Sequence, residues 1–502
     1  DADGTPYDDC GVTVRSGNFT MYGGNITGNE TRSWAYGCGV YVGHWNNNPA
    51  GTFTMYGGKI SGNKAQSFGG GVYAADNFTM YGGEISDNEA GDGGGVYVSS
   101  GGTFTMNGGT ISNNEATYSG SGRHGAGGGG VFIEYAGRFT MEKGLISKNK
   151  YTGTGSYPGG GGVYVQQMLN YEHSTDPAFT MKGGTISDNE TNYAGGGVYV
   201  GEYNRFTMEG GTISNNKAFA TSNNGRGEGG GVYAYGSFTM RGGEISGNNC
   251  DGSNYSGYLS GDGCLGGGVY VATDDDAAMT VSGNVKITGN TKSPKGGNSE
   301  KDNVYLPGKT ITIGGALTGE AGSIGVTTST EPKEKRPVTI AAAGSNYTIT
   351  KPDKDRFASD KEGFKVECKD DKLVLAMQTA ATEEHKHDLC GTTHTPAGEH
   401  QTEREVTFAT ELKMENGKLM KGGSEWTKST VNRADGGREQ TGYVLSQGEY
   451  YLYGDITLSD AAILINGDVK LCLNGHTIDR ANETGGLDYV IWVLGKDNAH
   501  LT

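Results

Sequence analysis

The residues best suited to binding a metal ion lie in one histidine-rich segment. The run Glu-His-Lys-His-Asp-Leu-Cys-Gly-Thr-Thr-His occupies residues 384–394. Imidazole and thiolate are preferred ligands of Zn²⁺, and structural zinc sites take them from closely spaced positions. One interpretation is therefore a zinc site at His385, His387, Cys390 and His394. The alternative is a polar linker, because a cysteine-rich zinc knuckle would need more thiols than this run supplies.

Three consecutive aspartates at residues 274–276 form the only tight acidic cluster of the chain. Carboxylate oxygens bind Ca²⁺, so this run is a candidate calcium site, with a solvated loop as the alternative. A polysaccharide lyase would add a lysine or arginine base, and a glycoside hydrolase would need two carboxylates about 5–9 Å apart. The sequence specifies neither arrangement. No catalytic residue is assigned, and the interpretation leans away from an enzyme.

The cysteines predict two disulfide bonds. Cys10 and Cys38 each precede a Gly-Val-x-Val run and so hold one position in two successive copies of a repeat. Stacked strands lie about 4.8 Å apart, within the Cα separation that a disulfide spans. Cys250 and Cys264 bracket one insert and could close it. Such bonds fit an extracellular setting, and simple stacking of thiols is the alternative for the first pair.

Recurring tyrosines predict a ligand-binding face. They hold the middle of a Val-Tyr-Val run or a close variant, and we expect them to stand outward on one face: Tyr41, Tyr73, Tyr97, Tyr164, Tyr199, Tyr233 and Tyr270. An exposed tyrosine offers a flat apolar ring and a hydroxyl, which suit sugar rings and antibody-type surfaces. The alternative is structural, since stacked rings stabilise neighbouring strands. A shorter second column consists of Tyr22, Tyr56 and Tyr81.

These side chains recur because the chain is built from a repeat. The segment Phe-Thr-Met-x-Gly-Gly-x-Ile-Ser-x-Asn starts, with small variations, at Phe19, Phe53, Phe78, Phe104, Phe139, Phe179, Phe206 and Phe238, and a worn copy starts at Ala278. A glycine cluster and a Val-Tyr-Val run or near equivalent follow each copy. Three short β-type runs separated by Gly or Asn turns make one coil of a parallel β-helix. The sequence therefore predicts an all-β fold, a right-handed parallel β-helix with three-strand coils of about 25 residues and insertions at two edges.

Alternation within one coil predicts which side chains face the core. Phe53, Met55, Ile60 and Val72 should point inward, because side chains along a strand alternate between its two faces. Stacking then produces continuous columns of identical residues. The asparagine that ends each motif should form a ladder of side-chain amides from coil to coil.

The repeat pattern also predicts the organisation of the chain. Residues 1–378 should form the β-helix, closed by a strand pair at 364–376, because repeat arrays need atypical ends. Residues 379–447 are expected to be a histidine-containing linker and mixed segment. Residues 448–502 are expected to begin a second, truncated β-helix. We interpret the chain as a fragment of a longer protein.

Composition narrows the class of protein. The chain has 502 residues, 92 of them glycine, and a formal net charge of −17. Glycine without a strict every-third period excludes collagen, and an acidic surface repels phosphate backbones, which argues against nucleic acid as a partner. No run of 18 or more apolar residues occurs, so no membrane-spanning helix is expected in this fragment.

Several motifs carry a resemblance to a known family. They are the two repeat motifs above, Asp-Asn-Val-Tyr-Leu-Pro from Asp302, and Leu-Cys-Leu-Asn-Gly-His-Thr-Ile from Leu471. With them the chain resembles the adhesin-like, or pectate-lyase-like, right-handed β-helix repeat surface proteins of gut Firmicutes. Some relatives of this kind look like immunoglobulin-binding superantigens. The likeness to pectate lyases implies a fold and not an activity, because one fold hosts many functions.

The sequence as a whole favours an extracellular protein, secreted or attached to the bacterial cell surface. We expect it to bind host or microbial glycans or glycoproteins, such as mucins or immunoglobulins, through its tyrosine face and edge loops. The first alternative is a polysaccharide lyase or glycoside hydrolase acting on one face of the β-helix. The second is a passive stalk.

Overall fold

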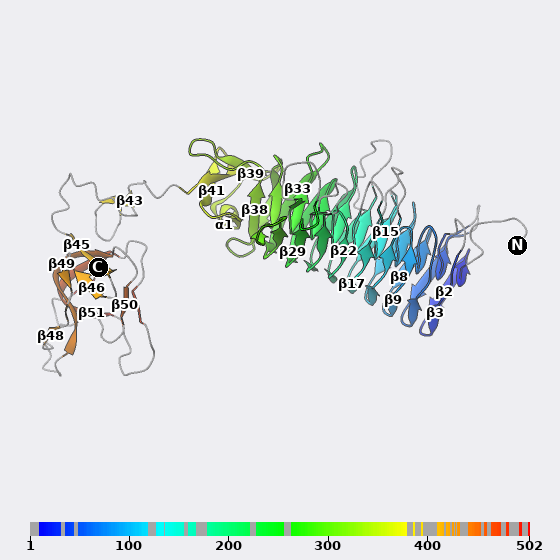
Figure 1. Ribbon diagram of the computed structural model, residues 1–502, viewed down its shortest axis with the longest axis horizontal. Coiled ribbons are helices and arrows are strands. Elements are labelled where there is room, and N and C mark those ends of the chain that lie inside the picture. The colour runs from blue at the N-terminus through cyan, green and yellow to red at the C-terminus, as the bar shows by residue number, and fades with distance from the viewer. Residues whose placement is uncertain are drawn as a thin grey trace, which may run out of the picture. The chain divides into compact units, whose positions relative to one another are not determined.

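A computed structural model describes residues 10–378, except 32–35, 45–48, 119–126, 135, 155–158, 167–177, 221–226 and 256–262, and beyond residue 378 it describes mainly short strands. The chain divides into two compact units, Asp1–Met377 and Gln378–Thr502. The first unit is an elongated stack of short strands (Figure 1). The predicted division of the second unit into a linker and a second β-helix stays a prediction.

Each coil of the first unit contributes one strand to each of three faces. The Phe-Thr-Met face contains β2 (Gly17–Met21), β5 (Gly51–Met55), β8 (Asn77–Met80), β12 (Thr103–Met106), β16 (Arg138–Met141), β20 (Phe179–Met181), β24 (Arg205–Met208), β29 (Ser237–Ser246), β33 (Ala278–Thr288), β37 (Ile311–Leu317) and β39 (Val338–Ala343). The Ile-Ser face contains β3 (Asn25–Thr27), β6 (Lys59–Ser61), β9 (Glu84–Ser86), β13 (Thr110–Ser112), β17 (Leu145–Ser147), β21 (Thr185–Ser187), β25 (Thr212–Ser214) and the second halves of β29 and β33. The Val-Tyr-Val face contains β1 (Val12–Val14), β4 (Val40–Val42), β7 (Val72–Ala74), β11 (Val96–Val98), β15 (Val131–Ile133), β19 (Val163–Val165), β23 (Val198–Val200), β28 (Val232–Ala234), β32 (Val269–Val271), β36 (Val304–Leu306), β38 (Ile324–Thr328) and β40 (Phe357–Ser359).

Strands on each face pair in parallel with their counterparts in the next coil. On the Phe-Thr-Met face Phe53 pairs with Phe78, and on the Val-Tyr-Val face Tyr73 pairs with Tyr97. The same register recurs along the stack, so like residues lie on like residues. The predicted fold class, a right-handed parallel β-helix, is confirmed.

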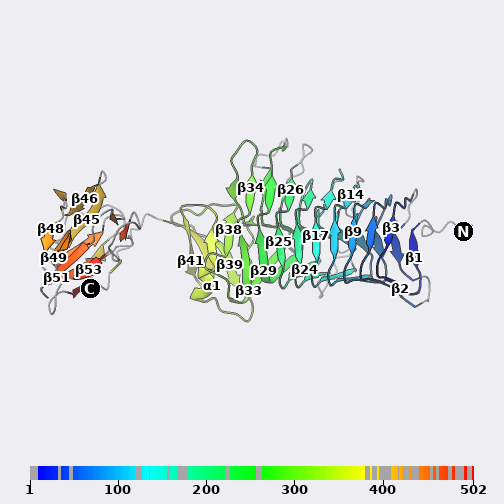
Figure 2. The ribbon, with the colours of Figure 1, turned by 90° about the horizontal axis from the view of Figure 1, so that it is seen from below.

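A fourth row of short strands follows the asparagine turn, where the sequence analysis expected only insertions. The row consists of β10 (Glu89–Ala90), β14 (Glu115–Ala116), β18 (Lys150–Tyr151), β22 (Glu190–Thr191), β26 (Lys217–Phe219), β30 (Asn249–Asp251), β34 (Thr291–Ser293) and β35 (Glu300–Lys301). It runs along one edge of the stack (Figure 2). A smaller pair beside it consists of β27 (Gly227–Glu228) and β31 (Cys264–Leu265). Pairing between these strands satisfies the backbone hydrogen bonds of the chain at the points where the inserts leave successive coils.

The core consists of the columns that the alternation predicts. Phe53, Met55, Ile60 and Val72 are fully buried, as are their counterparts in the following coils. The phenylalanine rings stack face to face, with centroids 4.9 Å apart between Phe53 and Phe78 and an interplanar angle of 7°. Each added coil therefore buries nearly the same apolar surface, which stabilises the stack in proportion to its length.

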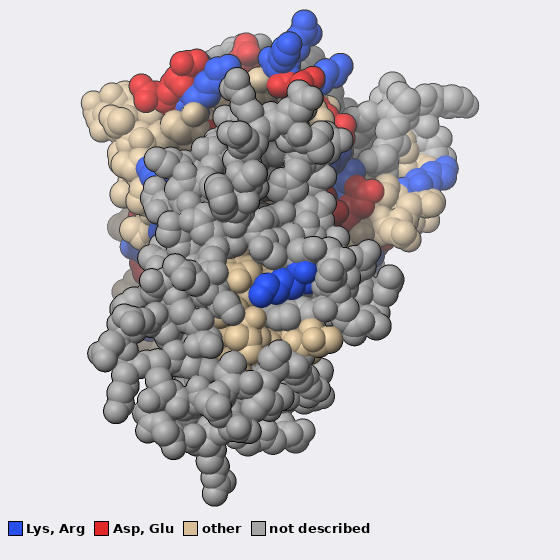
Figure 3. Space-filling view, turned by 90° about the vertical axis from the view of Figure 1, so that its left-hand side faces the viewer, with Lys and Arg blue, Asp and Glu red and all other residues tan. Residues whose placement is uncertain are grey.

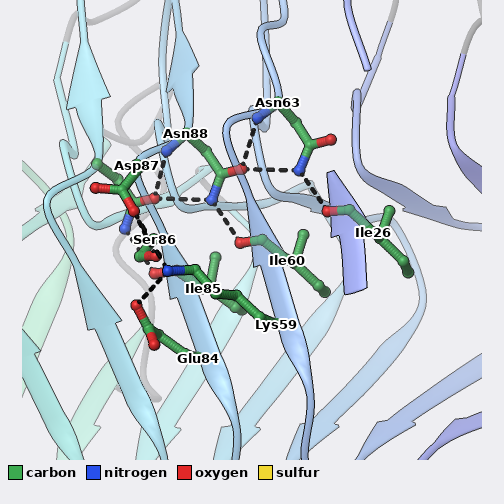
Figure 4. A network of polar contacts seen from close by, with 10 residues as sticks. Ile26, Lys59, Ile60, Asn63, Glu84, Ile85, Ser86, Asp87 and Asn88 are labelled. Carbon is green, nitrogen blue, oxygen red and sulfur yellow. Dashed lines mark hydrogen bonds and ion pairs between the residues drawn. The ribbon is translucent and has the colours of Figure 1, made fainter. Parts of the chain in front are cut away.

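The asparagine ladder is confirmed and is longer than predicted. Asn63 Nδ2 donates to Asn88 Oδ1 at 2.9 Å and to the Ile26 carbonyl at 3.0 Å, while the Asn63 backbone N–H also donates to Asn88 Oδ1 at 3.1 Å (Figure 4). The same three bonds recur, in one direction, through Asn88, Asn114, Asn149, Asn189, Asn216, Asn248 and Asn290. Each amide thus satisfies a buried backbone N–H and a buried carbonyl of the preceding coil and donates to the amide of the next coil.

The ladder ends on a carboxylate. Asn290 donates to Asn303, and Asn303 Nδ2 donates to Asp360 Oδ1 at 2.5 Å. The Asn303 backbone N–H donates to the other oxygen of Asp360 at 2.7 Å. Burial raises the pKa of Asp360, although these hydrogen bonds lower it. An acceptor-only group closes a column of amides that all donate toward it.

The glycine clusters reflect how closely the coils approach. A Cβ atom at Gly71 would lie 2.5 Å from the carbonyl oxygen of Gly95 and 2.7 Å from Cγ2 of Ile85. Gly69, two residues earlier, has a φ of +64°, which L side chains rarely adopt. Any larger residue at either position would separate the coils.

An antiparallel arrangement closes the C-terminal end of the β-helix. β42 (Lys372–Met377) pairs antiparallel with β39 and with β41 (Phe364–Lys369), as expected for a closing strand pair. A short helix, α1 (Lys351–Asp355), carries the buried Asp353, which accepts hydrogen bonds from Leu317, Tyr347 and Thr350. No helix in the described residues has the length and apolar character that crossing a membrane requires.

In the second unit five of the nine described strand pairings are parallel and four are antiparallel. They are β43 (His385–Lys386), β44 (Thr393–His394), β45 (Ala409–Glu415), β46 (Lys418–Lys421), β47 (Ser424–Glu425), β48 (Ser429–Val431), β49 (Gln440–Leu452), β50 (Ile456–Leu458), β51 (Ile463–Cys472), β52 (Ile478–Arg480), β53 (Ile491–Val493) and β54 (His500–Leu501). β45, β49, β51 and β53 pair in parallel in that order. Parallel pairing of this kind is what a second β-helix would require.

The ladder makes a stability prediction at its centre. Asn149→Ala removes the acceptor for the backbone N–H of Asn114, which leaves a buried donor unsatisfied. We expect the free energy of unfolding to fall by about 3 kcal/mol, measured by urea denaturation. The control is Leu145→Thr, which installs the residue that neighbouring coils carry at Thr110 and Thr185. Equal losses for the two variants would contradict a stabilising role for the amide.

Candidate functional site

The predicted tyrosine face lies mostly beside the core, with Tyr270 packed in the core itself, and the prediction that it is exposed is wrong. Tyr73 and Tyr97 are only 6% and 4% exposed. Tyr41, Tyr164 and Tyr270 are also buried, and Tyr199 and Tyr233 are partly buried. Tyr41, Tyr73, Tyr97, Phe132 and Tyr164 form an apolar cluster of their own beside the core. Their burial favours the structural alternative, although ligand binding by these residues stays untested.

Close packing at the glycine turns explains this burial. A Cβ atom at Gly69 would lie 3.0 Å from Cβ of Tyr73, so the turn lies directly against the tyrosine. Phe68, beside that glycine, packs on Tyr97 with ring centroids 4.9 Å apart. The Tyr73 hydroxyl donates to Ser99 Oγ at 3.0 Å. Burial raises the pKa of the Tyr97 hydroxyl well above its ordinary value, so it stays neutral.

The second, shorter tyrosine column is the one that solvent reaches. Tyr22, Tyr56 and Tyr81 are 77%, 48% and 50% exposed. Their rings stack with centroids 5.2 Å and 4.9 Å apart and interplanar angles of 7°. We call these three residues the corner tyrosines, because each directly follows a strand of the Phe-Thr-Met face and precedes the Gly-Gly turn.

Backbone geometry fixes the position of the corner tyrosines. The backbone N–H of Tyr56 donates to the Met21 carbonyl at 2.9 Å, and that of Tyr81 donates to the Met55 carbonyl at 2.8 Å. At this corner the chain turns away from the core, so the side chain projects outward. The signal in the sequence is tyrosine at the variable position before Gly-Gly, which predicts a shorter second column but not its greater exposure.

Stacking determines which parts of the corner tyrosines a ligand can contact. Rings that lie face to face cover most of one another's faces and leave their edges and hydroxyls outward. Thr20, Thr54 and Thr79 lie beside them on outward positions of β2, β5 and β8 and supply further hydroxyl groups. The site is therefore an uncharged strip of aromatic edges and hydroxyls that repeats once per coil.

Charged side chains replace tyrosine at the same corner in later coils. Lys182 Nζ lies 2.8 Å from Glu142 Oε1, and Arg241 lies 3.6 Å from Glu209. On the adjacent face Lys59 lies 3.1 Å from Glu84. Seen from the end in Figure 3, Lys and Arg (blue) likewise lie beside Asp and Glu (red) on part of the described surface, away from this corner. Pairing of opposite charges on successive coils leaves the tyrosine strip as the distinct apolar feature of this corner.

The cysteines that were predicted to form disulfides are thiols in the structure. Cys10 and Cys38 hold equivalent positions in successive coils, as expected, but their sulfurs point to different acceptors. Cys10 Sγ lies 2.9 Å from the Gly37 carbonyl oxygen, and Cys38 Sγ lies 2.8 Å from that of Asn29. Cys250 and Cys264 are both buried.

The candidate metal ligands gain no support from the described residues. His385 and His394 lie opposite each other in the antiparallel pair β43–β44, while His387 and Cys390 lie outside the described residues. Within the described part of the chain, no group of three His, Cys, Asp or Glu side chains is placed to hold a metal ion. Asp276, in the predicted calcium cluster, instead accepts a hydrogen bond from the Tyr203 backbone N–H at 2.6 Å.

Buried carboxyl groups are the functional candidates that the sequence analysis missed. Asp302 is fully buried, and Oδ2 accepts a hydrogen bond from the Gly266 backbone N–H at 2.7 Å. Its Oδ1 has no hydrogen-bond partner in the described structure. Burial is the main cause that raises the pKa of Asp302 to about 6. Burial also raises the pKa of Asp92, which accepts from the Gly127 backbone N–H.

These carboxyl groups do not form an acid–base pair. Asp92 and Asp302 belong to different coils, and each accepts a hydrogen bond from a backbone N–H in the glycine cluster of a neighbouring coil. A glycosidase needs two carboxyl groups facing one substrate bond.

Comparison with protein families, with curated proteins and with solved structures finds no match for this chain.

The raised pKa of Asp302 makes a prediction about pH. The folded state holds this proton more tightly than the unfolded chain, whose aspartates titrate near about 3.9. The resulting stabilisation is complete below about pH 4 and is lost as the pH rises through about 6. It amounts to about 2–3 kcal/mol.

Asp302→Asn should remove this part of the pH dependence. We expect the free energies of unfolding of the variant and the parent to differ by an amount that changes between pH 4 and pH 7 in urea titrations. Asp188→Asn is the control, because Asp188 is exposed on a turn where equivalent positions carry Asn113 and Asn215. A difference that is constant with pH would contradict the assignment.

Proposed function

We propose that this chain is an extracellular, cell-surface β-helix that binds glycans or glycoproteins of the host or of other microbes. The observation that carries the proposal is the strip of corner tyrosines, which are stacked, exposed and held on a rigid backbone. This strip replaces the buried tyrosine face as the proposed binding surface. The resemblance of the repeat to adhesin-like surface proteins supports the same function.

The chemistry of the strip suits carbohydrate. A sugar ring presents hydroxyl groups around an apolar body, and tyrosine presents a hydroxyl at the end of an apolar ring. Thr20, Thr54 and Thr79 add hydroxyls that can both donate and accept. Because the strip lacks charged side chains of its own, it favours neutral ligands over phosphate or sulfate.

Repetition supports a polymeric ligand. Tyr22, Tyr56 and Tyr81 follow one another at the coil spacing, with the same orientation. A linear glycan also presents equivalent groups at a regular repeat, so several weak contacts can form at once. Parallel pairing on both sides of the corner holds the tyrosine backbones in place before a ligand arrives, which reduces the entropy lost on binding.

The test is binding of the purified chain to an array that carries glycans, mucins and immunoglobulins. We expect saturable binding that falls about tenfold or more when Tyr56 is changed to Ala, since exposed aromatic anchors carry much of the energy of such interfaces. The double variant Tyr22→Ala/Tyr81→Ala should bind more weakly still than Tyr56→Ala.

Matched controls lie at the same corner in later coils. Asn107→Ala and Lys182→Ala change the equivalent position in later coils and should leave binding unchanged. Equal losses for control and tyrosine variants would refute the strip as the site. Release of unsaturated or reducing sugar ends would instead identify an enzyme, and a blank array would leave the chain as a stalk.

A further inference from the structure

Two buried cysteines meet at the edge of the β-helix, far along the stack from the corner tyrosines. Cys250 lies in β30 of the short-strand row, and Cys264 lies in β31 of the small pair beside it. Both side chains are fully buried. A side-chain hydrogen bond joins the two thiols. These residues are separated by 14 positions in the sequence, and the fold brings their sulfurs together.

Packing of the preceding coil shows why the sulfurs meet. Cys250 stacks on Ala218, and Cys264 stacks on Gly227. A Cβ atom at Gly227 would lie only 2.6 Å from the Ala218 carbonyl oxygen, so the two strands are in contact at these positions. Cysteines placed one coil further along both columns therefore face each other. Cys10 and Cys38 differ, since they hold one column and their thiols point to separate carbonyls.

Charged groups surround the pair. Lys292 follows Cys250 in the same column and is buried, with Nζ 3.4 Å from Glu300 Oε2. Asp302 is held near the pair by its hydrogen bond from the Gly266 backbone N–H, two residues after Cys264. Burial raises the pKa of the Cys250 thiol well above its ordinary value, and Lys292 opposes that effect. The Cys250 thiol is thus protonated and unreactive until the edge opens.

We propose that Cys250 and Cys264 are an oxidative modification site at which a disulfide bond joins β30 to β31. The oxidant is a low-molecular-weight disulfide such as oxidised glutathione. After loss of its proton, the Cys250 thiolate attacks one glutathione sulfur and releases a glutathione thiolate. The Cys264 thiolate then attacks Cys250 Sγ and releases the second. Two thiols become one disulfide, and two glutathione molecules carry away both protons and both electrons.

The bond would fasten the edge of the β-helix at a defined place. It closes a loop between a strand of the short row and the glycine cluster, which reduces the conformational freedom of the unfolded chain. Because the thiols are buried, the exchange requires local opening of the edge strands and proceeds faster during refolding. The proposal is independent of the corner tyrosines and of any ligand.

The experiment measures the covalent state of the full chain after refolding in a glutathione redox buffer. Acid quenching, alkylation and trypsin release residues 242–286, which contain both cysteines because no lysine or arginine lies between them. We expect this peptide to be lighter by two hydrogen atoms and to resist alkylation until a reductant is added. Cys10, Cys38 and Cys368 should remain open to alkylation once the chain is denatured.

A matched variant separates the bond from general effects of oxidation. Cys250→Ala with Cys264→Gly installs the residues that the preceding coil carries at Ala218 and Gly227, so the coil should still form. Reductant should lower the thermal unfolding midpoint of the parent chain by several degrees and leave that of the variant unchanged. Full alkylation of both cysteines after oxidative refolding, or their conversion to separate glutathione adducts, would overturn the proposal.

Discussion

The rest of the β-helix depends on the column of asparagines at its turns. Every amide in the column donates to the next amide and to a backbone carbonyl, and every amide oxygen accepts from a backbone N–H of the preceding coil. Such a network forms only when successive coils are in the same register, because a shift of one residue would bury unsatisfied polar groups. The column runs in one direction and ends on Asp360, whose two oxygens accept from Asn303. A turn residue thereby fixes the register of all three faces.

Fixed register turns the surface into a set of columns whose chemistry depends on where they lie. The Phe, Met, Ile and Val columns face inward and are buried. The long tyrosine column lies mostly beside this core, with Tyr270 inside it, and the glycine turns and aromatic neighbours such as Phe68 cover it. The corner tyrosines have the same chemistry but stand where the chain turns outward. Position in the coil, rather than residue type, therefore separates a stabilising column from an accessible one.

Residues that depart from the repeat supply the side chains with specific chemistry, namely the corner tyrosines and the paired cysteines. Tyrosine occupies the corner in three successive coils and gives way to charged pairs further along the stack. Cysteine replaces alanine and glycine in two adjoining columns of a single coil. In each case the uniform neighbouring coils provide a natural control residue at the same position. A regular scaffold with local substitutions of this kind can acquire a binding strip or a covalent link without disturbing the core.

The sequence by itself determined the fold class, the inward columns and the asparagine ladder, because each follows from a periodicity that stacking must preserve. It could not determine that Tyr73 and Tyr97 are covered, since their burial comes from the close packing of the glycine turns and of aromatic rings from adjacent coils. Nor could it place Asn303 and Asp360 at the end of the ladder, because Asp360 lies 57 residues further along the chain. The burial of Asp302 and the meeting of Cys250 with Cys264 likewise depend on edges that only the wound chain brings together. Repeating local patterns can be recognised from the sequence alone. Exposure and contacts between edges depend on the path of the backbone in three dimensions.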